Sequence, residues 1–150
     1  MTTLKEKLYA ACLAYVQQRM EAAELGIKEA QKAAGEDTKS SAGDKYETGR
    51  EMMQQETNRN LAQLNEANKL KVALNQINAS TVHSVVDQGS VVITNNGKFY
   101  IAISAGVLSV DGEQYVAISP ASPIGFKMKG LKVGNGFVLN GNEYMINTIL

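Results

Sequence analysis

Residues 1–78 carry apolar side chains at helical spacing. One stripe recurs at alternating steps of four and three residues and consists of Tyr9, Leu13, Val16, Met20, Ala23, Ile27, Ala30 and Ala34. A second, less regular stripe consists of Leu61, Leu64, Ala67, Leu70, Leu74 and Ile77. Because each stripe is too narrow to bury a core alone, we expect two antiparallel helices joined by a short loop and packed on each other.

The segment between the two stripes, Gly35 to Asp44, reads GEDTKSSAGD and favours a break in the helix. Glycine weakens helices, and Ser, Thr and Asp compete for local backbone hydrogen bonds. Asp44 followed by Glu47 fits the capping pattern that starts a second helix. Because a 30-residue helix reaches roughly 45 Å, the hairpin is expected to carry these two acids at the far tip of a rod.

The second half of the chain alternates short apolar runs with turn residues. Asn-Gly and Asp-Gly pairs between such runs predict hairpins, and the turns fall at Asn95-Asn96-Gly97, Asp111-Gly112 and Asn140-Gly141. Ser122 before Pro123 is typical of a helix start, and that helix is expected to end near Gly130. The pattern predicts an α+β chain, with a helix hairpin over residues 1–79 and a small antiparallel sheet with one helix over residues 80–150.

Charge, cysteine content and the lack of long apolar runs argue against several classes of protein. The chain has 150 residues, with 15 Lys+Arg against 15 Asp+Glu, so no overall basic field attracts nucleic acid and any such contact is local or made through a partner. Its one cysteine, Cys12, excludes a disulfide within the chain and is expected in the core. No run of about 18 apolar residues occurs, so we expect a soluble cytoplasmic protein that does not span a membrane.

A complete active site within the chain is not expected. The one histidine, His83, stands without evident partners, and no GxSxG, Walker or HExxH pattern occurs. Asp44 and Glu47 remain as candidates, since acids three residues apart at a helix start share one face. Two carboxylates supply only part of a Mg²⁺ coordination shell, so they would act beside phosphate and a metal held elsewhere. Plain helix capping explains the same spacing.

Two motifs resemble those of the bacterial Gre transcript-cleavage factors. The first is GDKYE, Gly43 to Glu47, which matches a Gly-Asp-x-x-Glu element at the tip of the family's N-terminal coiled-coil hairpin. The second is SPIG, Ser122 to Gly125, which is followed by GLKVG, Gly130 to Gly134. It matches a stretch of the family's C-terminal domain, which has an FKBP-like fold.

The resemblance implies a partner and a mechanism. Bacterial RNA polymerase would bind the C-terminal domain at the rim of its secondary channel, through Ser122, Pro123, Ile124 and Gly125. The coiled coil would enter the channel, where Asp44 and Glu47 help to place a second Mg²⁺ near the 3′ end of the nascent RNA. The polymerase itself would then cleave backtracked RNA, so the chain is expected to be neither an enzyme nor a binder of small-molecule substrates.

The chain differs from the family pattern after Glu47. Arg50 stands where a third acid is common, and it could pair with a tip acid or contact RNA phosphate. Three other functions stay open: a channel-binding regulator without cleavage, a prolyl isomerase suggested by the FKBP-like fold, and a coiled-coil adapter that does not bind polymerase.

Overall fold

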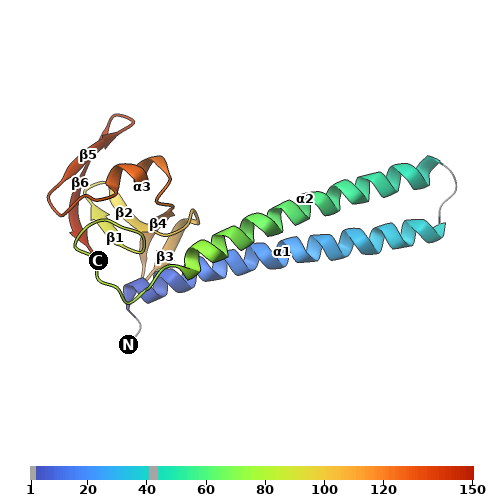
Figure 1. Ribbon diagram of the computed structural model, residues 1–150, viewed down its shortest axis with the longest axis horizontal. Coiled ribbons are helices and arrows are strands. Elements are labelled where there is room, and N and C mark those ends of the chain that lie inside the picture. Colours follow the sequence, from blue (N-terminus) through green and yellow to red (C-terminus); the bar gives the residue numbers. More distant parts are fainter. Residues whose placement is uncertain (1–2, 41–43) are drawn as a thin grey trace. The chain divides into compact units, whose positions relative to one another are not determined.

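The computed structural model describes the backbone of residues 3–40 and 44–150, and the side chains of residues 3–33, 49 and 51–150. Two long helices come first, followed by strands and one short helix, in the predicted α+β order (Figure 1). The helices are α1 (Leu4–Ser40), α2 (Asp44–Asn75) and α3 (Pro123–Met128). The strands are β1 (Val91–Thr94), β2 (Gly97–Ile101), β3 (Gly106–Val110), β4 (Glu113–Ile118), β5 (Gly136–Leu139) and β6 (Asn142–Ile149).

The chain divides into two compact units. One is the hairpin segment Val16–Lys71, and the other combines Met1–Tyr15 with Val72–Leu150. The second unit therefore contains the start of α1, the end of α2 and the sheet. The domain boundary predicted from the sequence, with residues 1–79 as the helix hairpin and residues 80–150 as the sheet domain, stays a prediction.

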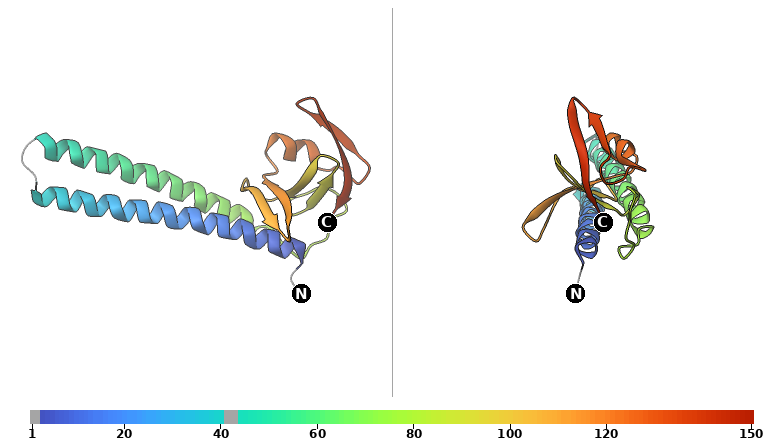
Figure 2. Two further views of the ribbon diagram at one scale, coloured as in Figure 1. Left: turned by 180° about the vertical axis from the view of Figure 1, so that it is seen from behind. Right: turned by 90° about the vertical axis from the view of Figure 1, so that its left-hand side faces the viewer.

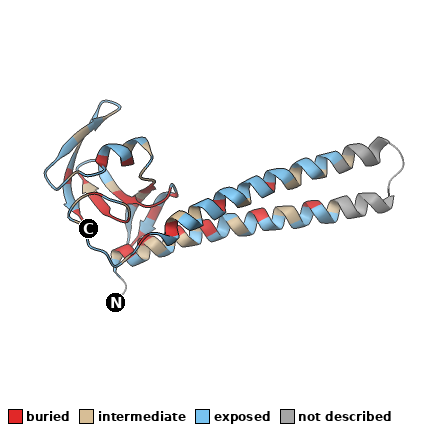
Figure 3. Cartoon of the chain, in the orientation of Figure 1, coloured by how far each residue is buried: buried red, intermediate tan, exposed pale blue. Residues whose placement is uncertain are grey.

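Small side chains let α1 and α2 approach closely in the hairpin segment. Ala23, Ala30 and Ala67 are buried, and Figure 3 shows buried residues at intervals along both helices. At Gly26 an added Cβ would lie 2.5 Å from Oδ1 of Asn60, whose side chain therefore fills the space that the glycine leaves. The Nδ2 of Asn60 donates to the backbone oxygen of Glu56 at 3.0 Å, so this buried amide has a partner.

Two details of the hairpin differ from the sequence-based expectation. Helix α1 continues through Gly35 to Ser40 instead of breaking at Gly35. One glycine costs a helix about 1 kcal/mol, which a helix of 37 residues tolerates. Leu61 is exposed, and its neighbour Asn60 is buried in the position that the stripe had assigned to leucine.

Within the described residues the strands form one sheet in the order β3-β4-β2-β1-β6-β5. The sheet is mixed and not wholly antiparallel, because β2 and β4 pair in parallel. The reason is topological: the chain leaves β2, forms the edge strand β3, and turns back at Asp111-Gly112 so that β4 fills the gap between them. Asp111 and Gly112 both have positive φ, at 52° and 79°, as the predicted tight hairpin requires.

Both faces of the central strands are buried. On one face Val92, Phe99 and Ile101 belong to a core that also contains Met128 of α3. On the other, Val91 pairs with Tyr100, and both are fully buried. Cys12 of α1 is also fully buried and lies close enough to the Tyr100 hydroxyl to influence its pKa. This confirms the prediction of a core cysteine, and burial raises the pKa of its thiol to about 12.

Candidate functional site

The two acids predicted to act on a metal fall at the junction of the long helices. Helix α1 ends at Ser40 and α2 begins at Asp44, so Asp44 and Glu47 belong to the first turn of α2. Their side chains lie outside the described residues. Among the side chains that the structure does describe, no group of three or more His, Cys, Asp and Glu is placed to hold a metal ion.

The Ser-Pro motif forms the start of α3, as predicted. The Ser122 hydroxyl accepts from the backbone N–H of Gly125 at 3.1 Å and donates to the backbone oxygen of Ser119 at 2.7 Å. Pro123 occupies the first turn, where its missing N–H costs nothing. Gly125 is required because an added Cβ would lie 2.3 Å from the Ser119 oxygen. Ile124 packs against the core of the sheet. Three of the four motif residues, Ser122, Ile124 and Gly125, therefore have roles in folding or packing this helix.

A different set of α3 residues faces solvent. Gly125 and Met128 are buried, whereas Pro123, Phe126 and Lys127 are exposed. Positions i, i+3 and i+4 of a helix share one face, so these three residues form an outward surface, which we call the α3 face. Phe126 is 73% exposed, and sequence analysis did not single it out. The three-residue spacing between Pro123 and Phe126 is the sequence signal that could have identified Phe126 as part of this face.

Two hollows flank the end of α3. A larger one, of about 410 Å³, is bordered by the segment Val82–Asp87 together with Lys129 and Gly130. A smaller one, of about 70 Å³, shares Val86, Asp87 and Lys129 with it. Backbone hydrogen bonds from Gly130 N to Val86 O and from Val86 N to Leu131 O, both 2.9 Å, fix the two segments against each other.

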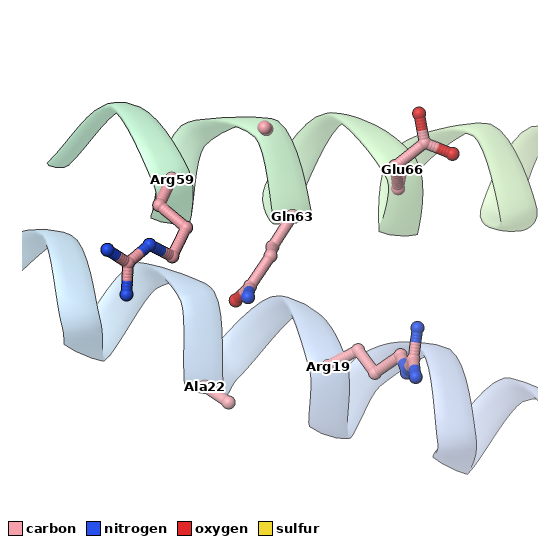
Figure 4. Close-up of a pocket in the computed structure, with 6 residues that line it drawn as sticks. Arg19, Ala22, Arg59, Gln63 and Glu66 are labelled. Carbon is pink, nitrogen blue, oxygen red and sulfur yellow. The ribbon is translucent and has the colours of Figure 1, made fainter. Parts of the chain in front are cut away.

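A groove of about 460 Å³ lies between the two helices of the hairpin segment. Figure 4 shows the guanidinium of Arg59 extending toward α1 and the Gln63 side chain lying between the helices. Ala22 and Ala62 open the groove because their side chains are short, and Arg19 and Glu66 complete its lining. Arg59 also forms an ion pair with Glu56 at 3.5 Å.

The lone histidine proves to have partners. The buried Nζ of Lys5 lies 3.0 Å from Nδ1 of His83 and donates to the backbone oxygen of Thr81. Burial is the main cause that lowers the pKa of His83, and the nearby Lys5 adds to it. These contacts attach the start of α1 to the segment after α2, within one compact unit. They give His83 a role in folding.

No helix in the part of the chain that the structure describes is both long and apolar enough to cross a membrane. Neither a protein-family model nor a curated protein sequence matches the chain. Among solved structures, one described as the structure of the transcription factor Gfh1 is similar at 22% sequence identity over 93% of this chain and 93% of that chain, with a TM-score of 0.36. A likeness of this size assigns neither a family nor a function.

Proposed function

We propose that the protein is a transcription elongation factor that binds RNA polymerase at its secondary channel and stimulates cleavage of backtracked RNA. One observation carries the proposal: Asp44 and Glu47 fall in the first turn of α2, directly after the junction of two long paired helices. The Gly-Asp-x-x-Glu resemblance requires that position. The second motif also falls where the resemblance requires it, at the start of the helix that packs on the sheet.

The donor set fits a shared Mg²⁺ site and not a self-contained one. Two carboxylates one turn apart provide at most a part of six oxygen ligands, and the remainder would come from the polymerase, RNA phosphate and water. A second Mg²⁺ in the polymerase would activate the water that attacks the phosphodiester. In this proposal Asp44 is the main metal-facing acid, and Glu47 supports it or orients that water.

The paired helices α1 and α2 are long enough to carry Asp44 and Glu47 into the polymerase channel. Helices of 37 and 32 residues correspond to about 55 Å and about 48 Å of length at 1.5 Å per residue. The close packing at Gly26 and Asn60 keeps the pair narrow. A narrow helical hairpin with acids at its junction is suited to reach an active site through a channel, while the sheet unit binds the outer surface of the polymerase.

The test is RNA cleavage in purified backtracked elongation complexes with Mg²⁺. Wild type is compared with Asp44→Asn/Glu47→Gln and with the matched control Glu21→Gln/Glu24→Gln, which removes two exposed acids of the same spacing from the middle of α1. We expect all three proteins to bind polymerase and only the Asp44/Glu47 variant to lose stimulation. Equal cleavage by both variants would overturn the role of the two acids.

The second candidate is a channel-binding regulator that does not stimulate cleavage. Arg50, three residues after Glu47, favours it, because a cation at that spacing lies on the face of the acid and competes with a metal ion for it. Binding of wild type to polymerase without any cleavage would select this regulator. A failure of wild type to bind polymerase would reject both candidates.

A further inference from the structure

The α3 face is not explained by folding. Ser122 caps the helix, Gly125 admits the Ser119 carbonyl, and Met128 is part of the core. The aromatic ring of Phe126 takes no part in these contacts and is 73% exposed. A single exposed apolar side chain is common on protein surfaces, so the meaning of Phe126 depends on what surrounds it.

The chain segment that contains Phe126 is positively charged. From Ser119 to Asn135 the chain contains Lys127, Lys129 and Lys132 and no Asp or Glu. None of the ion pairs formed within the described residues involves these lysines. On a chain with no net charge, this segment is locally positive and carries an exposed aromatic side chain.

The larger hollow begins at Lys129, the residue that follows α3. Lys129 borders it together with Val82, which is 86% exposed, and Asp87. Lys129 follows Phe126 by three residues at the end of α3, so the ring and the hollow lie on connected parts of one compact unit. The surface therefore combines exposed apolar side chains with cations.

A protein surface fits these features better than a nucleic acid. Asp87 lines both hollows with Lys129 and interrupts the cations there, whereas a phosphate backbone is bound by a continuous basic patch or stripe. Val82 and Phe126 offer apolar contacts, which suit the side chains of a protein partner. Buried aromatic anchors surrounded by charged rims are typical of protein interfaces.

We propose that Phe126 is the anchor of a docking surface, with Lys127 and Lys129 at its rim, and that its partner is an acidic polymerase surface with an apolar pocket. The identity of the partner rests on the function proposed above. The inference changes the predicted contact residues: of the four motif residues only the exposed Pro123 belongs to the surface, and Phe126 and the lysines are added.

The experiment measures binding of the full chain to core RNA polymerase at about 0.1 M and about 0.5 M salt. Phe126→Ser is compared with the matched control Val107→Ser, which removes an apolar side chain that is 61% exposed on the edge strand β3. We expect Phe126→Ser to weaken binding by about tenfold or more, as for an interface anchor. The control should stay within about twofold of wild type, because rim and non-interface residues contribute little.

A charge variant tests the rim. Lys127→Glu/Lys129→Glu should weaken binding by about fivefold or more at low salt, and the loss should shrink at high salt because exposed charges are screened. Both lysines are exposed, so its thermal midpoint should equal that of wild type.

The outcomes separate this inference from the proposed function. If wild type binds and Phe126→Ser binds as well as Val107→Ser, the docking surface is wrong and the proposed function stands. If wild type does not bind, both fail. If Lys127→Glu/Lys129→Glu retains polymerase binding but loses affinity for a single-stranded RNA or a DNA duplex, the lysines contact nucleic acid and the docking surface is overturned.

Discussion

The Nζ of Lys5 and the Nδ1 of His83 lie 3.0 Å apart, and the same ammonium donates to the backbone oxygen of Thr81. A lysine donates only, so the imidazole nitrogen accepts, and His83 must be neutral for the contact to form. Burial and the nearby Lys5 lower the pKa of His83, while Asp87 and a backbone hydrogen bond to Leu150 partly oppose the shift. The contact between Lys5 of α1 and the segment after α2 therefore depends on the protonation state of His83.

The lowered pKa of His83 predicts a loss of stability in mild acid. At about pH 7.5 and above, a full unit over the unfolded pKa of about 6.5, the ring is almost entirely neutral in both the folded and the unfolded chain, so this contribution to the free energy of unfolding is constant. As the pH falls from about 6.5 toward the lower pKa of the folded state, the unfolded chain binds the proton first and stability decreases. Chemical unfolding at pH 7.5 and pH 5.5 measures the effect.

His83→Gln is the matched control for this pH dependence, because glutamine keeps a hydrogen-bonding side chain and does not titrate. It should show a smaller fall in unfolding free energy between the two pH values than wild type. Carboxylates contribute equally in both proteins, so an identical fall would mean that His83 is not responsible.

The start of α3 predicts two unequal losses of stability. Ser122→Ala removes the cap on Gly125 N and should cost about 1 kcal/mol, or about 3 °C in thermal midpoint. Gly125→Ala should cost about 3 kcal/mol, because its Cβ would lie 2.3 Å from the Ser119 oxygen and the backbone would have to move. Ser109→Ala, at an exposed site on β3, is the control and should be neutral. The reverse order of the two costs would contradict the described geometry.

The hairpin segment predicts a coupling between Gly26 and Asn60. Gly→Ala inside a helix normally stabilises by about 1 kcal/mol, but here the new methyl would lie 2.5 Å from the Asn60 amide oxygen. Gly26→Ala should therefore destabilise by about 1 kcal/mol in wild type. With Asn60→Ala present, the same change should stabilise by up to about 1 kcal/mol. A four-protein unfolding cycle measures the coupling, and additive effects would refute it.

Arg50 predicts an effect on cleavage through Glu47. Its side chain lies outside the described residues, but a spacing of three on a helix brings the two charges to one face. If they pair, Arg50→Ala frees the carboxylate and should raise cleavage by about twofold to fivefold, the range of an exposed ion pair. A decrease would indicate contact with RNA phosphate, and no change would exclude both roles. Arg50→Lys keeps the charge and should remain close to wild type.

Local chemistry made the element types predictable. The turns at Asp111-Gly112 and Asn140-Gly141 need two residues with positive φ, and each has them. Ser122 and Pro123 mark the start of α3 because capping and a fixed φ act within one helical turn. The end of α1 was harder to predict, because glycine and polar residues only weaken a helix, and α1 continues past Gly35 to Ser40.

Contacts between helices and between strands could not be predicted from the local sequence. Asn60 is buried and Leu61 is exposed, the reverse of the expectation, because the Asn60 side chain fills the space that Gly26 leaves. The spacing of apolar residues in the sequence does not reveal this close approach of the helices. The parallel pairing of β2 with β4 depends on where β3 lies in the sheet, and alternation along a strand is the same for parallel and antiparallel neighbours. Figure 2 shows the sheet strands and α3 from two further directions.

The sequence by itself determined the helix pair, the strands and their tight turns, and the position of Asp44 and Glu47 at the helix junction. These depend on interactions within a few residues, which the order of side chains specifies directly. Only the tertiary structure decided that Met128 of α3 is buried in the core of the sheet, that Phe126 on the same helix faces solvent, and that His83 accepts from Lys5. Each of these depends on burial and on residues distant in the chain, so it is fixed only when the elements pack.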